Sequence, residues 1–190
     1  MPIYNDNRMF LFYPDLRKLI SEAFSYQMRE RPDIIAGTST AGIPHATTLA
    51  DRMNLPLIYV RDKPKDHGLR NQIEGIDSEK DLEGRSIVLI EDLISTGESS
   101  ARAVRVIREA NGRCDLCISI FNYELKEAER VFDEIAPECE VRSILGYRKL
   151  LEVAEEINYI NKDRVRMLQE WREDPFGWGE RHGFPRIKKE

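Results

Sequence analysis

The sequence lacks most of the features that mark secreted, membrane-spanning or nucleic-acid-binding proteins. Only three of its 190 residues are cysteine, an odd number, so no disulfide framework is expected. No apolar run approaches the length that crosses a bilayer, and the stretch MPIYNDNRMF lacks the basic and apolar regions of a secretory signal. Acidic residues outnumber basic ones, 34 against 29, which argues against a nucleic-acid or anionic-membrane partner. These absences favour a cytoplasmic enzyme or binding protein.

Two of the cysteines form a C-x-x-C pair, a spacing that occurs in metal and redox sites. Cys114 and Cys117 lie in CDLCISIF, however, which is typical of a buried strand. Residues three apart on a strand point to opposite faces of the sheet, so we expect that the pair cannot share a metal ion. All three cysteines, Cys139 included, are predicted to be core thiols.

Apolar residues alternate along the chain between strand-like and helix-like spacing. Strand-like spacing predicts strands at 33–37, 57–60, 86–90, 114–121 and 141–145. Helix-like spacing predicts helices at 14–29, 43–53, 98–111, 125–135 and within 147–171. Gly112 is expected to end the helix at 98–111.

This order of elements predicts an α/β fold, a mainly parallel twisted sheet with helices on both faces and a Rossmann-like core. One domain is expected over residues 1–175, followed by an irregular tail over 176–190. Ligands of such sheets bind beyond the carboxyl ends of the strands. That rule directs attention to the loops at 38–42, 61–75 and 91–99, the second of which is polar and expected to be unstructured.

The stretch IVLIEDLISTGESS joins a buried strand to a turn that suits a sugar phosphate. The strand is expected to place two carboxylates, Glu91 and Asp92, at the sheet edge. The turn of Ser95, Thr96 and Gly97 leads straight into a helix whose free N–H groups can bind phosphate. Carboxylates beside a phosphate-binding turn are favourable only if they bind hydroxyls, a metal ion or a developing cation. A sugar phosphate offers all three. The alternative is an ordinary strand–turn–helix with solvated acids.

The pattern [VIL]-[ED]-D-x-x-[ST]-T-G-x-S after an apolar strand resembles the phosphoribosyl-diphosphate motif of the type I phosphoribosyltransferases. The resemblance implies that Glu91 and the catalytic Asp92 hold the ribose 2′- and 3′-hydroxyls, while the turn holds the 5′-phosphate. Glu98 replaces a commoner small residue, and we expect it to complement the helix dipole from the solvent side. The substrate-binding residues that this motif implies are Glu91, Asp92, Leu93, Ile94, Ser95, Thr96, Gly97, Glu98 and Ser99.

A second stretch, YVRDKPKDHGLRNQIEG, gathers basic residues in an otherwise acidic protein. Such charges suit a departing polyanion, because a mobile loop can close over it and exclude water. The alternative is a solvated charged loop. The segment resembles the loop of bacterial orotate phosphoribosyltransferases, which implies that Arg61, Lys65 and His67 contact the diphosphate, with Lys65 and His67 catalytic. It also implies a homodimer in which the loop 61–75 reaches the partner's site. Asp62 stands where some members carry lysine.

The resemblance extends from Pro2 to about Pro175. The stretch IIAGTSTAGIPHATTLADRMNLP resembles the family's strand, diphosphate-contacting loop and following helix, in which His45 is expected to be structural. In the family, the match to PIYNDNR normally follows a base-covering helix and strand, so this sequence is expected to start after that segment. The substrate contacts implied for the loop are Thr38, Thr40, Ala41 and Gly42.

The implied reaction displaces diphosphate from C1 of 5-phosphoribosyl 1-diphosphate by a ring nitrogen of orotate, giving orotidine 5′-phosphate in de novo pyrimidine biosynthesis. Mg²⁺ is the implied cofactor, held mainly by the substrate's diphosphate rather than directly by the protein. Two alternatives stay open. One is a phosphoribosyltransferase for another base, since the ribose-phosphate cradle is shared. The other is a non-catalytic protein that senses the sugar diphosphate or a nucleotide.

Overall fold

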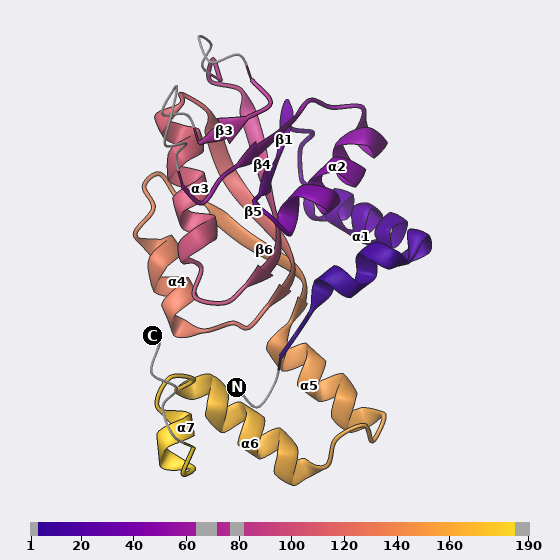
Figure 1. The fold of residues 1–190 in the computed structure, drawn as a ribbon, viewed down its shortest axis with the longest axis vertical. Coiled ribbons are helices and arrows are strands. Elements are labelled where there is room, and N and C mark those ends of the chain that lie inside the picture. Colours follow the sequence, from indigo (N-terminus) through magenta and orange to yellow (C-terminus); the bar gives the residue numbers. More distant parts are fainter. Residues whose placement is uncertain (1–3, 64–71, 77–81, 185–190) are drawn as a thin grey trace.

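The computed structural model describes residues 4–63, 72–76 and 82–184, which form one twisted sheet flanked by helices (Figure 1). The six strands of the sheet are ordered β3-β2-β1-β4-β5-β6. Neighbouring strands are parallel except for β3, which pairs antiparallel with β2. The strands are β1 (Ile34–Thr38), β2 (Leu57–Val60), β3 (Ile73–Glu74), β4 (Ser86–Ile94), β5 (Arg113–Asn122) and β6 (Glu140–Gly146).

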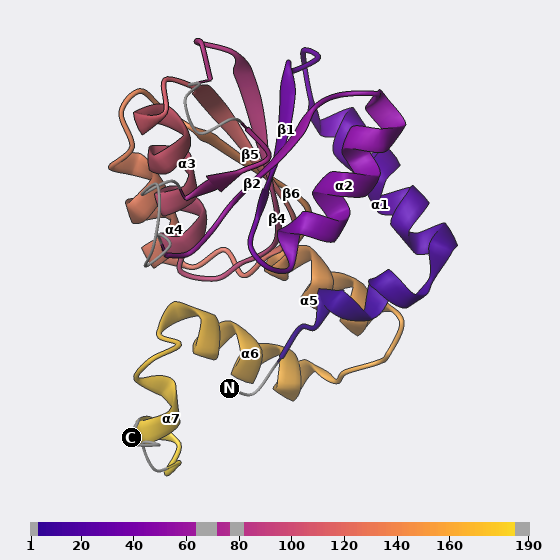
Figure 2. The ribbon, with the colours of Figure 1, turned by 45° about the horizontal axis from the view of Figure 1, so that its top comes forward.

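Helices cover both faces of the sheet, which confirms the predicted fold class (Figure 2). Helices α1 and α2 pack on one face and α3 and α4 on the other, while α5 to α7 lie beyond the carboxyl end of β6. None of these helices combines the length and apolar character needed to cross a bilayer. The helices are η1 (Asn7–Phe12), α1 (Pro14–Gln27), α2 (Gly42–Met53), α3 (Glu98–Glu109), α4 (Lys126–Asp133), α5 (Tyr147–Glu156), α6 (Lys162–Glu173) and α7 (Trp178–Arg181).

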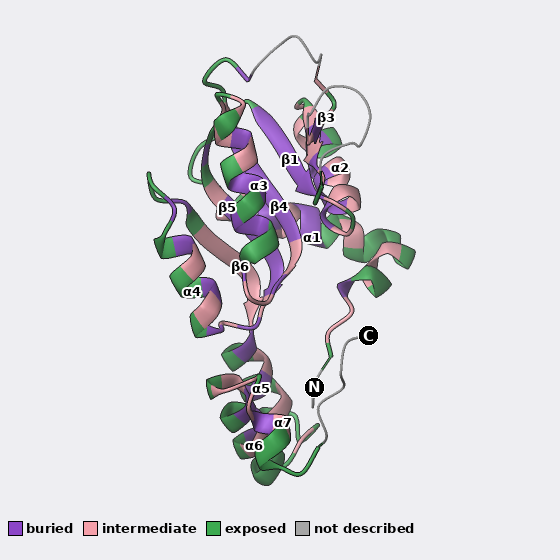
Figure 3. Ribbon diagram, turned by 60° about the vertical axis from the view of Figure 1, so that its left-hand side comes forward, coloured by how far each residue is buried: buried purple, intermediate pink, exposed green. Residues whose placement is uncertain are grey.

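Each face of the sheet buries its own apolar cluster, and the central strands β1 and β4 are buried along most of their length (Figure 3). Such strands are apolar at nearly every position because neither face meets water. On the α1/α2 face, Ile35 and Ile90 pack with Phe24 and Leu49. On the α3/α4 face, the cluster includes Leu89 of β4. Full burial of each such large side chain contributes about 1.5–3 kcal/mol.

A third cluster, rich in aromatic side chains, joins the sheet to the C-terminal helices. Tyr123 lies just after β5, and its ring contacts Trp171 with centroids 5.6 Å apart. The Tyr147 hydroxyl donates to the carbonyl oxygen of Leu168 at 3.1 Å. Trp178 of α7 is buried in the same cluster. The segment from residue 176, predicted to be an irregular tail, therefore contains a short helix that packs against the rest of the chain.

Several predicted boundaries differ from the structure by one to four residues, and one strand was not predicted. Strand β4 continues to Ile94, because Leu93 and Ile94 pair with β5. Strand β3 lies in the stretch expected to be unstructured. Helix α3 ends at Glu109, and the left-handed φ of 61° belongs to Asn111 rather than to Gly112.

The three cysteines are free and buried, as predicted. Cys114 and Cys117 nevertheless belong to one cluster on the same face, together with Cys139, so the prediction of opposite faces was wrong. The register explains the error: Ser86 pairs with Arg113 and Val88 with residue 116, so β5 holds one extra residue there. Such a bulge breaks the two-residue alternation.

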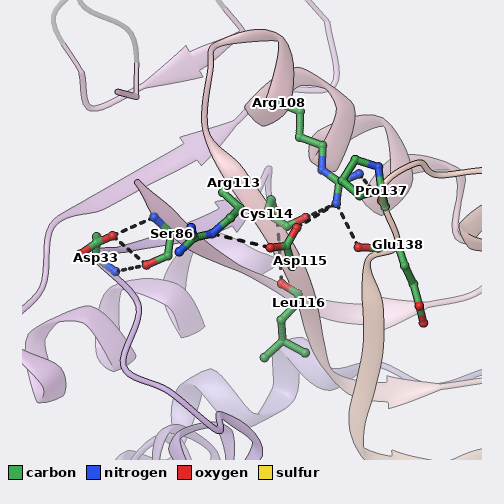
Figure 4. A network of polar contacts seen from close by, with 9 residues as sticks. All are labelled: Asp33, Ser86, Arg108, Arg113, Cys114, Asp115, Leu116, Pro137 and Glu138. Atoms are coloured by element: carbon green, nitrogen blue, oxygen red, sulfur yellow. Dashed lines mark hydrogen bonds and ion pairs between the residues drawn. The ribbon is translucent and has the colours of Figure 1, made fainter. Parts of the chain in front are cut away.

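The amino ends of the strands are fastened by polar contacts to main-chain atoms (Figure 4). Arg108 of α3 donates to the carbonyl oxygens of Cys114 at 2.7 Å and Pro137 at 2.5 Å. The Asp33 carboxylate accepts from the main chain of Ser86 at 2.8 Å and from its hydroxyl at 2.7 Å. These contacts anchor the edge of the sheet opposite the predicted loops.

Candidate active site

The predicted loop Thr38–Gly42 packs against the end of β4. The Thr38 hydroxyl donates to the carbonyl oxygen of Ile90 at 3.4 Å. Gly42, the first residue of α2, has no room for a side chain, because a Cβ there would lie 2.6 Å from that same oxygen and 3.5 Å from the Cα of Glu91. Thr40 and Ala41 complete the loop between the strand and the helix. The structure therefore brings this loop beside the acidic pair, as the sequence predicted.

Glu91 is buried inside β4, whereas the prediction placed it at an open sheet edge. Its side chain faces α3, where the Ser100 hydroxyl donates to Oε2 at 3.0 Å. The main-chain N–H of Asp92 donates to Oε1 at 3.0 Å. Burial, followed by contact with Asp92, raises the pKa of Glu91 to about 8. Burial therefore favours the protonated form of Glu91.

This raised pKa makes the stability of the fold fall as pH rises. The unfolded value is near 4.5 and the folded value about 8, so the folded state binds the proton more tightly between them. In that window Glu91 should lower the free energy of unfolding by about 1.4 kcal/mol per pH unit. We expect Glu91→Gln, which keeps the shape without titrating, to lose this slope and to exceed the unmodified protein in stability at pH 8. Urea unfolding at pH 5, 6.5 and 8 tests this; equal slopes for the two proteins would contradict it.

The Asp92 carboxylate lies near α2 and also near Glu91. Its charge acts on His45 of α2. Asp92 is only half-buried while Glu91 is 6% exposed. Of the two acids, Asp92 is therefore the one open to a ligand.

The turn after β4 positions the start of α3. Gly97 has a φ of 79°, and a Cβ there would lie 3.2 Å from the Cα of Ala128. Within the described part of the chain no side chain caps the helix at Gly97, so its first N–H groups can bind an anion. Glu98 and Ser99 are exposed in this first turn, which agrees with the interpretation that Glu98 complements the helix dipole.

Two of the predicted substrate-binding residues, both ahead of the phosphate turn, have side chains in the core. Ile94 is 1% exposed in the α3/α4 cluster. Leu93 packs against the aromatic cluster. Both belong to β4, so only their main chain could contact a substrate, while Ser95 and Thr96 remain half-exposed in the turn itself.

The basic loop is described only at its two ends. Lys65 and His67 lie outside the described residues. Arg61 follows β2, and its guanidinium lies 3.4 Å from Oε1 of Glu74 in β3. The main-chain N–H of Arg61 donates to the carbonyl oxygen of Gln72 at 2.8 Å. Arg61 is thus held at the carboxyl end of β2, on the same sheet edge as the acidic pair.

Sequence reasoning missed two polar side chains that hold the acidic pair. Ser100 could have been found from its position three residues after Gly97, on the inner side of an amphipathic helix. Asn7 donates to the carbonyl oxygen of Asp92 at 2.7 Å. No local pattern marks this contact, because it joins segments far apart in the chain.

A model of the phosphoribosyl transferase domain matches residues 8–143, most of the chain. The same architecture occurs in the crystal structure of orotate phosphoribosyltransferase from Aeropyrum pernix, with a TM-score of 0.68 at 22% identity, over 83% of this chain and 85% of that one. The chain therefore belongs to the phosphoribosyltransferase family.

Curated relatives narrow the class further. An orotate phosphoribosyltransferase from Streptococcus agalactiae is 43% identical over 180 residues, covering 93% of this chain and 83% of that protein. Another from Listeria monocytogenes is 39% identical over 181 residues, covering 94% and 84%. The resemblance to orotate phosphoribosyltransferases predicted from the sequence is confirmed.

Proposed function

We propose that the chain transfers the phosphoribosyl group of 5-phosphoribosyl 1-diphosphate to orotate, giving orotidine 5′-phosphate and diphosphate. The observation that carries this proposal is the identity of about 40% to orotate phosphoribosyltransferases along nearly the whole chain. The site agrees chemically, since one sheet edge holds an accessible carboxylate, an uncapped helix N-terminus and an arginine. These groups suit ribose hydroxyls, a phosphate and a diphosphate in turn.

Within this proposal, Asp92 binds the ribose hydroxyls and offsets the positive charge that develops on the ring as the bond to diphosphate breaks. Glu91, neutral and bonded to Ser100, keeps the end of β4 in place and leaves the negative charge on Asp92. The N–H groups at the start of α3 bind the 5′-phosphate. Gly42 and Arg61 are proposed to contact the leaving diphosphate.

Mg²⁺ supplies charge neutralisation of the diphosphate in this class of reaction. Among residues 4–63, 72–76 and 82–184, no group of three or more His, Cys, Asp or Glu side chains is arranged to hold a metal ion. We propose that the donor's own phosphate oxygens carry the ion, an arrangement that Mg²⁺ favours in nucleotide sites. The lysine and histidine of the basic loop, Lys65 and His67, are proposed to stabilise the same leaving group.

A panel of bases tests the substrate. Purified protein is mixed with Mg²⁺, 5-phosphoribosyl 1-diphosphate and one of orotate, uracil, adenine or hypoxanthine, and diphosphate release is followed. We expect turnover with orotate alone. Turnover with another base would reassign the substrate, and binding of the sugar diphosphate without turnover would indicate a sensing protein.

We also propose that the protein is a homodimer, supported by apolar side chains exposed on the outer side of η1 and α1. Phe12 is 83% exposed and Leu19 61% exposed. Leu16 and Tyr26 extend the same stripe at helical spacing. Exposed apolar stripes of this kind mark protein interfaces, and a two-fold axis would pair the stripe with its copy.

Leu19→Glu is expected to weaken this dimer, because a carboxylate would be buried in the interface. We expect the dimer dissociation constant from sedimentation equilibrium to rise by at least about tenfold. Lys18→Glu places the same side chain at the adjacent exposed position and should have a small effect. A dimer that is equally stable in both variants would exclude this surface.

A further inference from the structure

The main chain of Asp92 is held by a side chain from the other end of the domain. Asn7 of η1 donates its Nδ2–H to the carbonyl oxygen of Asp92 at 2.7 Å, across 85 positions of sequence. Asn7 is 3% exposed, so water cannot replace this bond. Breaking a buried hydrogen bond leaves both partners unsatisfied and costs more than breaking an exposed one. The contact therefore fixes the backbone that carries the Asp92 side chain.

The segment around Asn7 is itself fixed on both sides. The Asn5 N–H donates to the hydroxyl of Tyr123, just beyond β5, at 3.2 Å. The Asp6 carboxylate caps η1 by accepting from the N–H of Arg8 at 3.2 Å. Since Tyr123 is packed in the aromatic cluster, the segment spans the ends of β4 and β5. Asn7 thus reaches Asp92 from a rigid support.

A second buried side chain borders Asp92 on the side of α2. His45 is 2% exposed, and its Nε2 has no hydrogen-bond partner within the described part of the chain. Burial lowers the pKa of His45, and the charge of Asp92 opposes this lowering with a smaller effect. The imidazole is therefore neutral at neutral pH. A neutral imidazole leaves the negative charge of the Asp92 carboxylate available to a ligand, whereas a positively charged imidazolium would offset that charge.

The geometry points to Asn7 as a positioning residue for Asp92. Asn7 acts only through the backbone of Asp92 and has no contact with substrate in this assignment. The inference rests on the proposed function, because it takes the ribose hydroxyls of the sugar diphosphate as the ligand of Asp92. It adds a segment before α1 to the elements that set donor affinity.

Titration calorimetry of 5-phosphoribosyl 1-diphosphate with Mg²⁺ tests this role on the full chain. Asn7→Leu has a similar size but no donor, and we expect its dissociation constant to rise about tenfold. Asn7→Asp should weaken binding further, because a carboxylate would face the carbonyl oxygen. In steady-state assays the KM for the sugar diphosphate should rise while the KM for orotate stays unchanged.

A matched control separates positioning from general stability. Ile20→Val trims the core beneath α1 without contacting Asp92, so it should lower the thermal midpoint while leaving donor binding unchanged. The positioning role would be overturned if Asn7→Leu bound the sugar diphosphate as tightly as the unmodified protein does. It would also be overturned if Ile20→Val lost as much affinity as Asn7→Leu. Either result would leave the proposed function standing. Failure of the unmodified protein to bind the sugar diphosphate would overturn the proposed function, and this inference with it.

Discussion

Replacing Asp92 by asparagine is expected to lower kcat/KM for orotate transfer by about a hundredfold to a thousandfold. Asparagine has nearly the same shape and leaves the main-chain bond from Asn7 intact. It removes the negative charge that offsets the positive ribose ring in the transition state. The loss should appear mainly in kcat, because the charge on the ring develops during reaction rather than on binding.

The neighbouring acid supplies the control for this prediction. Because burial favours the protonated form of Glu91 and its side chain bonds Ser100 of α3, Glu91→Gln should change kcat/KM by less than about threefold at pH 7. Steady-state kinetics on both variants, with urea unfolding to establish that each is folded, measures the contrast. Equal losses in the two variants would contradict the division of roles between a neutral Glu91 and a charged Asp92.

Gly42→Ala is expected to damage both the fold and donor binding. An added Cβ would lie 2.6 Å from the carbonyl oxygen of Ile90, and a main-chain atom cannot turn aside as a flexible side chain can. The start of α2 must therefore move away from β4. We expect a loss of about 1–3 kcal/mol in the free energy of unfolding and a rise of at least about tenfold in the dissociation constant of the sugar diphosphate.

Gly179→Ala is the matched control, because the nearest atom to a Cβ at that position lies 3.8 Å away. Its stability should stay within about 0.5 kcal/mol of the unmodified protein. Urea unfolding and calorimetry give the two quantities. Unchanged donor binding in Gly42→Ala would exclude the loop Thr38–Gly42 from the diphosphate site.

The parallel sheet was predictable because its strands are continuous apolar runs separated by amphipathic helices. The position of the candidate site followed, since parallel strands bring their carboxyl ends to one edge. The environment of each acid could not be predicted in the same way. Whether Glu91 is exposed depends on how far β4 continues, which is set by pairing of Leu93 and Ile94 with β5 rather than by local sequence.

The remaining differences also come from tertiary contacts. The bulge in β5 that places Cys114 and Cys117 on one face depends on the register with β4. The contact from Asn7 to Asp92 joins positions that no periodicity relates. Trp178 is buried because α7 returns to the aromatic cluster, although its Gly- and Pro-punctuated surroundings are typical of a loop.

Transfer of the phosphoribosyl group to orotate is tested most directly by comparing, in one reaction, the amounts of orotate consumed and diphosphate released. Purified unmodified protein is incubated with Mg²⁺, orotate and 5-phosphoribosyl 1-diphosphate, and both quantities are measured over time. Transfer predicts equal molar amounts, with no diphosphate release when orotate is omitted. Diphosphate release without loss of orotate, or no reaction despite binding of the sugar diphosphate, would contradict it.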